Sequence, residues 1–147
     1  MRIDDIDQED ADIDWFATDS NGYILHVASG GGVLPESVAA SQEVLLELHQ
    51  YFLTLAEAES AEAVPLEAGA EQDAHFQGFA RYAHRGLFSF AKAQLHDRAD
   101  ARYYVVARPV RPLTVAELPK HIATLLSRTK LPVSVAQQTS LDISTIL

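Results

Sequence analysis

The 147-residue chain contains no cysteine, one methionine and one tryptophan. Without cysteine it can form no disulfide, bind no metal through thiolates and use no thiol as a nucleophile. It lacks an apolar run near the roughly 20 residues that a membrane-spanning helix needs, so we expect no membrane span. The first 15 residues carry one basic residue and no apolar segment, which is unlike a secretory signal peptide, and we expect a cytoplasmic protein.

Basic residues are almost absent from the first half of the chain. Residues 1–80 contain 17 of the 21 acidic residues and a single basic one, Arg2, whereas residues 81–147 contain the other ten basic residues. Such an asymmetry predicts either attraction between the halves in the fold or a charged face for a partner. Nucleic acid is disfavoured as that partner, because phosphate would repel a chain whose net charge is −10.

Residues 4–14 read DDIDQEDADID and carry seven acidic side chains. Blocks of like charge are typical of solvated segments, so we interpret residues 1–13 as a flexible acidic leader and residues 14–147 as a single globular domain. A second interpretation is that the leader contacts a basic protein partner. The side chains that would make this contact are those of Asp5, Asp7, Asp10 and Asp12.

The stretch WFATDSNGYILHV, residues 15–27, has the pattern of a β-hairpin. Its DSNG segment suits a type I turn closed by glycine, which makes a three-residue loop. This loop predicts a register in which Trp15 faces Val27 on one side of the ribbon and Phe16 faces His26 on the other. The first side is more apolar, so we expect Trp15, Leu25 and Val27 in the core and His26 on the outer side.

Apolar spacing and turn signals place the other elements. Helices are predicted at 36–57, at about 71–84 and within 114–129, where Thr114 and Glu117 form a capping box. Leu46 and Leu53 widen the apolar stripe of the first helix, which we expect to be well buried. Strands are predicted at 87–95, 101–110 and 131–136, the first two joined by the turn HDRAD. This order predicts an α+β fold: a largely antiparallel sheet of about five strands, two hairpins and a short C-terminal strand, packed against three helices.

Local motifs for chemistry are missing. Gly30-Gly31-Gly32 lies between a strand and a helix, but no phosphate-loop motif surrounds it and no basic residue lies between Arg2 and Arg81, so we interpret it as a turn. A calcium loop starting at Asp10 is disfavoured, because Trp15 and Asn21 stand where such a loop needs glycine and a bidentate glutamate. No two of the six histidines have HExxH spacing, and GxSxG is absent. We therefore expect no catalytic residue, no cofactor and no metal.

A family resemblance is confined to about 22 residues. DWFATD at 14–19, GYI at 22–24, SGGG at 29–32 and LP at 34–35 resemble the opening of small bacterial proteins that include immunity proteins of polymorphic toxin systems. The resemblance implies a cytoplasmic α+β domain that neutralises a toxin by binding it. With the charge distribution, it leads us to expect a non-enzymatic protein-binding domain whose acidic surface contacts a basic toxin.

Two alternatives stay open. FATDSNGYILHV also resembles the opening hairpin of PAS-type sensor domains, which implies a small ligand. An enzyme is the other alternative, with a non-local site that brings His26 to a distant carboxylate. The oligomeric state is open as well, a homodimer included.

Overall fold

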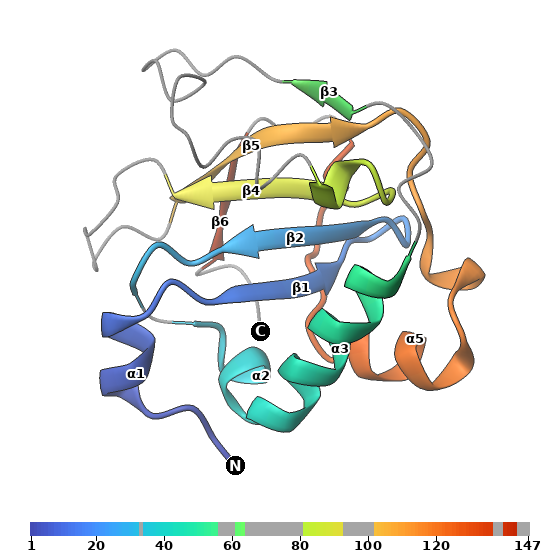
Figure 1. Cartoon of the computed structure of the whole chain (residues 1–147). Coiled ribbons are helices and arrows are strands. Elements are labelled where there is room, and N and C mark those ends of the chain that lie inside the picture. The colour runs from blue at the N-terminus through green and yellow to red at the C-terminus, as the bar shows by residue number, and fades with distance from the viewer. Residues whose placement is uncertain (33, 56–60, 64–80, 93–101, 137–139, 144–147) are drawn as a thin grey trace.

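The computed structural model describes residues 1–32, 34–55, 61–63, 81–92, 102–136 and 140–143. Figure 1 shows the helices gathered along one edge of a sheet, with the helix Gln42–Thr54 in front of the edge strand Asp14–Thr18. The helices are α1 (Asp5–Asp10), α2 (Glu36–Ala39), α3 (Gln42–Thr54) and α5 (Lys120–Leu126), with a 3-10 turn, η2 (Val115–Glu117). The strands are β1 (Asp14–Thr18), β2 (Ile24–Ala28), β3 (Ala61–Ala63), β4 (Phe88–Lys92), β5 (Arg102–Pro109) and β6 (Ser140–Asp142).

The sheet is mixed. Its order is β1-β2-β4-β5-β3, and β6 also pairs with β5. The α+β class is confirmed, but the sheet is not built from antiparallel pairs throughout, because β2 and β4 run parallel in its middle. Parallel neighbours need a long crossover connection, and the chain between these two strands supplies one that includes α2 and α3. The predicted strand at 131–136 does not form, and the last short strand is β6.

The first hairpin has the predicted register. Trp15 pairs with Val27, and Phe16 with His26. Asp19 holds the turn, because its buried carboxylate accepts hydrogen bonds at Oδ1 from the backbone N–H groups of Asn21 (2.9 Å) and Tyr23 (2.8 Å). Gly22 closes the loop with φ +83°, a conformation that favours glycine. The other oxygen of Asp19 accepts from the N–H of Val135 (2.8 Å), so one carboxylate joins the turn to a distant segment.

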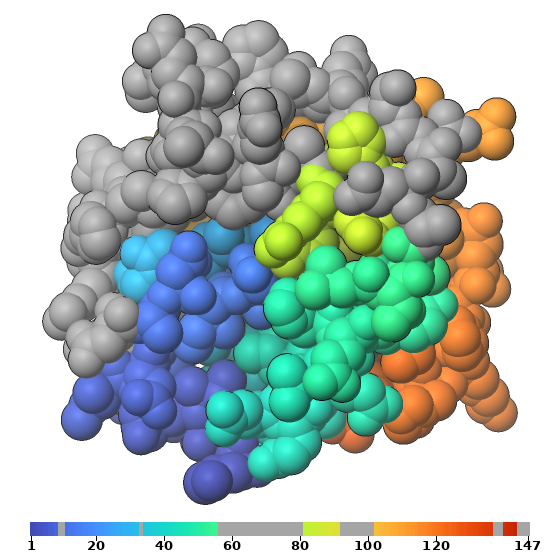
Figure 2. Space-filling model, in the orientation of Figure 1, coloured from blue at the N-terminus to red at the C-terminus, as the bar shows by residue number. Residues whose placement is uncertain are grey.

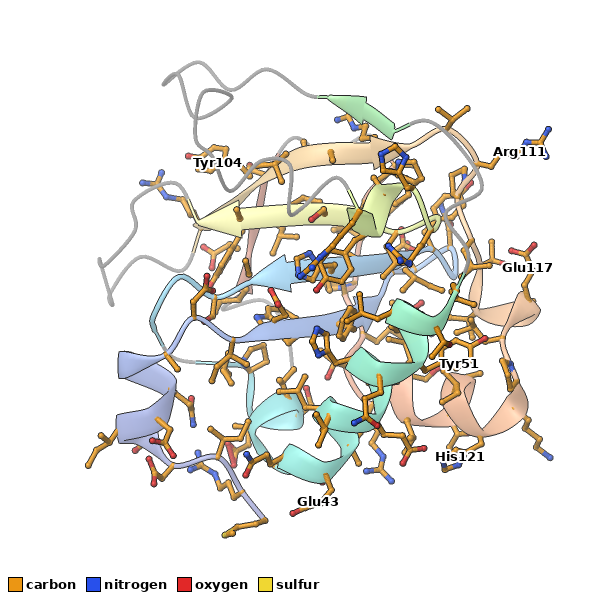
Figure 3. The ribbon with its side chains drawn as sticks, viewed as in Figure 1. Glu43, Tyr51, Tyr104, Arg111, Glu117 and His121 are labelled. Atoms are coloured by element: carbon orange, nitrogen blue, oxygen red, sulfur yellow. The ribbon has the colours of Figure 1, made fainter. Side chains whose placement is uncertain are left out.

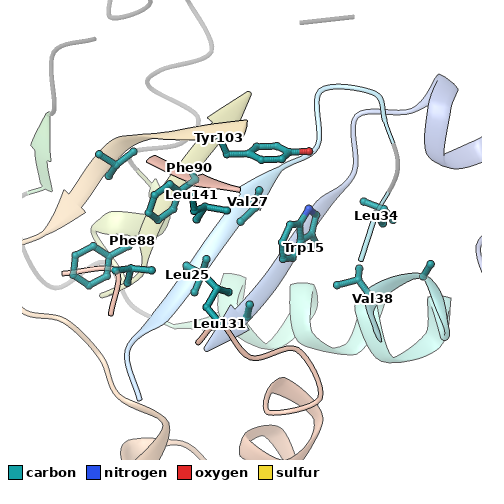
Figure 4. Packing of buried hydrophobic residues seen from close by; sticks show 14 of the residues in the cluster. Trp15, Leu25, Val27, Leu34, Val38, Phe88, Phe90, Tyr103, Leu131 and Leu141 are labelled. Atoms are coloured by element: carbon teal, nitrogen blue, oxygen red, sulfur yellow. The ribbon is translucent and has the colours of Figure 1, made fainter. Parts of the chain in front are cut away.

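Both faces of this hairpin are buried, which corrects the expectation that one side is exposed. Trp15, Leu25 and Val27 lie in the predicted core, together with aromatic residues of β4 and β5 (Figure 4). On the opposite face, Phe16 and Ile24 join a second apolar cluster that includes residues of α3 and α5. His26 therefore lies inside the protein rather than on its outer side, with no exposed surface.

The helices depart from the prediction where polar residues interrupt them. The helix expected at 36–57 is two helices, because Ser41 leaves the helical conformation and caps α3 by accepting from the N–H of Val44 (3.2 Å). Leu48 and Phe52 are buried as expected, but the side of α3 that carries Leu46 faces solvent and leaves that residue 53% exposed. The capping box of Thr114 and Glu117 is present at η2. Most of the helix expected at 71–84, and the HDRAD turn, lie outside the described residues.

The acidic segment at the start of the chain forms α1. Asp4 caps the helix by accepting from the N–H of Asp7 (2.8 Å). Ile3 is buried in the first core cluster, and the buried side chain of Gln8 donates to the carbonyl of Ile3 (2.9 Å) and accepts from the N–H of Leu34 (2.9 Å). Two uncharged residues, Ile3 and Gln8, thus attach this acidic segment to the rest of the domain, although its overall composition is that of a solvated leader.

The Asp19→Ala variant is expected to lose about 3 kcal/mol of unfolding free energy, because it leaves several N–H groups without their charged acceptor. Urea unfolding monitored by circular dichroism measures this loss. Asp7→Ala, which changes an exposed carboxylate, is the control and should stay within about 0.5 kcal/mol of the wild type. Equal losses in the two variants would contradict the role given to Asp19.

Candidate functional site

Three neighbouring strands bring polar side chains together on the sheet face that α3 covers. Asp14 begins β1, His26 lies in the middle of β2, and Ser89 lies in β4. His26 and Ser89 are direct partners in the parallel β2–β4 ladder. The hairpin register places His26 on the same face as Phe16 and the apolar residues of the second cluster. A polar side chain in such surroundings needs hydrogen-bond partners for each of its ring nitrogens.

His26 has these partners on both sides of its ring. Its Nε2 lies 2.8 Å from Oδ1 of Asp14, and its Nδ1 lies 2.8 Å from Oγ of Ser89. Burial lowers the pKa of His26, and the hydrogen bond to Asp14 offsets this only in part. Burial also raises the pKa of Asp14, but the hydrogen bond from His26 and the nearby cationic groups outweigh burial and bring the pKa below its usual value.

These pKa directions determine the proton positions. Asp14 is ionised and can only accept, so the neutral ring of His26 carries its proton on Nε2 and donates it to Asp14. The other nitrogen, Nδ1, then accepts the hydroxyl proton of Ser89. The chain of donors runs from Ser89 through His26 to Asp14 and holds the Asp14 carboxylate in one orientation.

Three further side chains surround the second oxygen of Asp14. The Tyr82 ring stacks on His26, with centroids 3.7 Å apart, and its hydroxyl donates to Asp14 Oδ2 over 3.4 Å. His49, from α3, has its Nε2 3.3 Å from the Tyr82 hydroxyl and 4.0 Å from Asp14 Oδ2. Arg81 donates from Nη2 to the Tyr82 hydroxyl over 3.4 Å. The side chains of Asp14 and His49 are 30% and 33% exposed, so solvent reaches this part of the cluster.

The inner part of the cluster has the residue types of a Ser-His-Asp triad but not its working geometry. Ser89 and His26 have no exposed surface, so a substrate cannot reach the hydroxyl in this structure. The serine also bonds to Nδ1 and the aspartate to Nε2, the reverse of the arrangement in serine proteases. The inner residues therefore orient Asp14, and solvent reaches the cluster at Asp14 and His49, which lie beside the buried ring of Tyr82.

Sequence reasoning singled out one member of this cluster, His26, and proposed a distant carboxylate as its partner in the enzyme alternative. The structure brings His26 to Asp14, which belongs to the acidic segment. Ser89, His49 and Tyr82 were missed, because they follow Asp14 at separations of tens of residues that no local motif describes. Ser89 is placed by the pairing of β2 with β4, and His49 and Tyr82 by the packing of helical segments on β1 and β2, neither of which is visible in the sequence.

The residues predicted to bind a partner lie apart from this cluster, on α1 and just after it. Asp5 and Asp7 are exposed, and Arg2 is 3.5 Å from Asp5. Asp12 is also exposed, and its Oδ1 accepts from the N–H of Gly30 (2.9 Å). Asp10 ends α1, and its side chain lies outside the described part of the structure.

The glycine loop is engaged with the chain itself. Gly30 and Gly31 have φ values of +62° and +80°, which explains glycine at these two positions. The N–H of Gly30 donates to Asp12, that of Gly31 to the Ser29 hydroxyl (3.4 Å) and that of Gly32 to the carbonyl of Gln8 (3.0 Å). The loop therefore binds the acidic segment to β2 and leaves none of these three donors aimed at a phosphate.

No protein-family model, curated protein or solved structure matches this chain. Within the described ranges, no three side chains of His, Cys, Asp or Glu gather as a metal-binding group. None of the helices in that part of the chain has the length and apolar character to cross a membrane.

The buried His26 makes stability depend on pH. Its pKa in the folded protein is below the ordinary value of about 6.5, so the unfolded chain binds a proton there that the folded protein does not. The free energy of unfolding should therefore fall as pH decreases below about 6.5, by at most about 1.4 kcal/mol per pH unit for this one group. Urea unfolding between pH 7.5 and 5.5 measures the slope, and NMR titration of the His26 ring measures its protonation directly.

His121→Gln is the control, because His121 is an exposed histidine on α5 and its removal should leave the slope in place. An NMR midpoint for His26 above 6.5, or a stability that does not change over this pH range, would contradict the burial argument.

Proposed function

We propose that this chain is a protein-binding domain that recognises a basic partner through an acidic face, as an immunity protein does when it neutralises a basic toxin. The acidic face consists of the exposed carboxylates of α1 and of the first turns of α2 and α3. Its members are Asp5, Asp7, Glu36 and Glu43.

Backbone contacts join the parts of this face. The N–H of Ile3 donates to the carbonyl of Ala39 (2.9 Å), and the N–H of Gln42 donates to the carbonyl of Met1 (2.9 Å). Arg2 adds a forked ion pair with Glu36, in which Nε and Nη2 each lie 2.9 Å from a carboxylate oxygen. Figure 2 shows α1, the N-terminal residues and α3 side by side on one face, and Glu43 projects from the start of α3 in Figure 3.

The exposure of Ile6, between the carboxylates of Asp5 and Asp7 on α1, is the observation that carries this proposal. Ile6 is 70% exposed between Asp5 and Asp7, while the same segment buries Ile3 and Gln8 to attach itself to the domain. A single exposed apolar side chain is ordinary, but this one stands on an anchored helix between two exposed carboxylates. That combination supports an interface in which an apolar contact is surrounded by charged residues.

The charge of the face supports a basic partner. Like charges held close together on a folded surface raise the local negative potential, which attracts a cationic protein and speeds its diffusional encounter. Arg2, which contacts Asp5 and Glu36, and the N-terminal ammonium group, which pairs with Glu43, neutralise only part of the charge of the four carboxylates. The family resemblance of residues 14–35 suggests that the partner is a toxin, and basic nucleases are toxins with the required charge.

The acidic side chains and the apolar side chain of this face should affect different rate constants of partner binding. The combined variant Asp5→Asn/Asp7→Asn should lower the association rate constant by roughly tenfold at low salt, because it removes charge that steers the encounter. Ile6→Ser should leave association nearly unchanged and raise the dissociation rate constant, because it removes the central apolar contact. Both rates are measured by surface plasmon resonance with a partner captured at low salt and then purified.

Glu117→Gln is the matched control for charge, because it removes one negative charge on the side of the molecule that carries η2 (Figure 3). It should alter neither rate by more than about twofold, since Glu117 and α1 lie on opposite sides of the molecule in Figure 3. Binding that is indifferent both to salt and to the Asp5/Asp7 variant would refute the acidic face as the recognition surface.

A further inference from the structure

Three oxygen and nitrogen atoms at the outer end of the polar cluster form a compact triangle. They are Oδ2 of Asp14, Nε2 of His49 and the hydroxyl oxygen of Tyr82. Their separations are 3.3 Å from His49 to Tyr82, 3.4 Å from Tyr82 to Asp14 and 4.0 Å from Asp14 to His49. The atoms come from β1, α3 and the helical turn at residues 81–83, so the tertiary fold assembles the triangle.

These separations are long for direct hydrogen bonds between such groups. A hydroxyl that donates to a carboxylate normally approaches to about 2.5–2.7 Å, because the acceptor is charged. His26 shows the normal behaviour in the same cluster, since its two bonds are 2.8 Å each. The outer three groups therefore face one another without closing to the distance that their own hydrogen bonds would favour.

The same separations suit three ligands of one metal ion. The centre of the triangle lies about 2.1 Å from each of the three atoms, and oxygen and nitrogen ligands bind first-row transition metals at about 2.0–2.2 Å. Asp14 and His49 are about one-third exposed, whereas Tyr82 is 1% exposed, so an ion would enter past Asp14 and His49 and keep its open coordination positions on their side.

The hydrogen bonds that hold Asp14 from behind also fit a metal site. The oxygen of Asp14 that does not face the triangle accepts from His26, which Ser89 holds in turn. Hydrogen bonds of this kind orient a ligating carboxylate and are a regular part of metal sites. The buried Ser89–His26 pair, which no substrate can reach, would thereby orient Asp14 as a metal ligand.

We propose that Asp14, His49 and Tyr82 bind a ferric ion, with the remaining coordination positions open to water or a small anion. Carboxylate and phenolate are anionic oxygen donors that suit a small, highly charged ion of this kind, and imidazole also binds iron. On binding, the Tyr82 hydroxyl releases its proton to solvent and the phenolate oxygen forms the bond to iron. Two anionic ligands leave the trivalent ion with a net positive charge next to Arg81, which favours an anion in an open position.

The test is a titration of the purified full-length chain with ferric nitrilotriacetate near pH 7. Tyrosinate bound to iron(III) absorbs visible light by charge transfer, so one equivalent of iron should produce a visible band. Tyr82→Phe should abolish the band, and His49→Gln should weaken iron binding by at least tenfold. Ser89→Ala should weaken it by a smaller factor, because it acts only through His26.

Two matched controls locate the site. Tyr51→Phe alters a half-buried tyrosine on α3 and should leave the band intact, as should His121→Gln, which alters a histidine that contacts Glu47 on the surface. Circular dichroism shows whether each variant is folded. If Tyr82→Phe does not fold, the iron affinity of His49→Gln tests the site instead, because His49 is partly exposed. Absence of the band in the wild type, or its persistence in Tyr82→Phe, overturns the proposal, as does iron affinity unchanged in His49→Gln.

Discussion

Burial of β2 on both faces is the constraint from which the polar cluster follows. The hairpin register directs His26 to the face opposite Trp15, and the helices that cover this face enclose the imidazole ring completely. A buried ring nitrogen without a partner costs on the order of 1–3 kcal/mol, so the interior must supply two partners. Asp14 and Ser89 do so from the strands on either side. Because His26 needs a partner at Nε2, it fixes the orientation of the Asp14 carboxylate. That orientation brings the second oxygen of Asp14 close to Tyr82 and His49.

In the acidic segment, one buried apolar side chain and one buried amide are enough to attach a highly charged stretch of chain to the domain. The carboxylates of Asp5, Asp7 and Asp12 remain in solvent, while Ile3 and Gln8 connect the segment to the core and to the residues after the glycine loop. Asp12 contributes a hydrogen bond to Gly30 and Asp14 contributes to the polar cluster. The same run of acidic residues thus has two structural anchors at its end and an exposed face at its start, where the proposed partner would bind.

Much of the local structure could be predicted from the sequence, because its causes are local. The register of the first hairpin follows from the DSNG turn, and the capping box at Thr114 follows from a spacing of three residues. Predictions that required knowledge of distant neighbours were less successful. Leu46 was expected to be buried with its stripe and His26 to be outside, since the pattern of one segment does not say what covers it. The mixed sheet was missed for the same reason.

The sequence by itself determined the α+β class, the hairpin with its paired residues and the segregation of acidic from basic side chains. Each depends on turn geometry, periodicity or composition, which act over a few residues or need no contacts at all. Only the tertiary structure decided that β2 lies parallel to β4 and that both faces of the hairpin are covered. Contacts such as that between His26 and Ser89, 63 residues apart, form only when the global packing of the chain offsets the entropy of closing so long a loop.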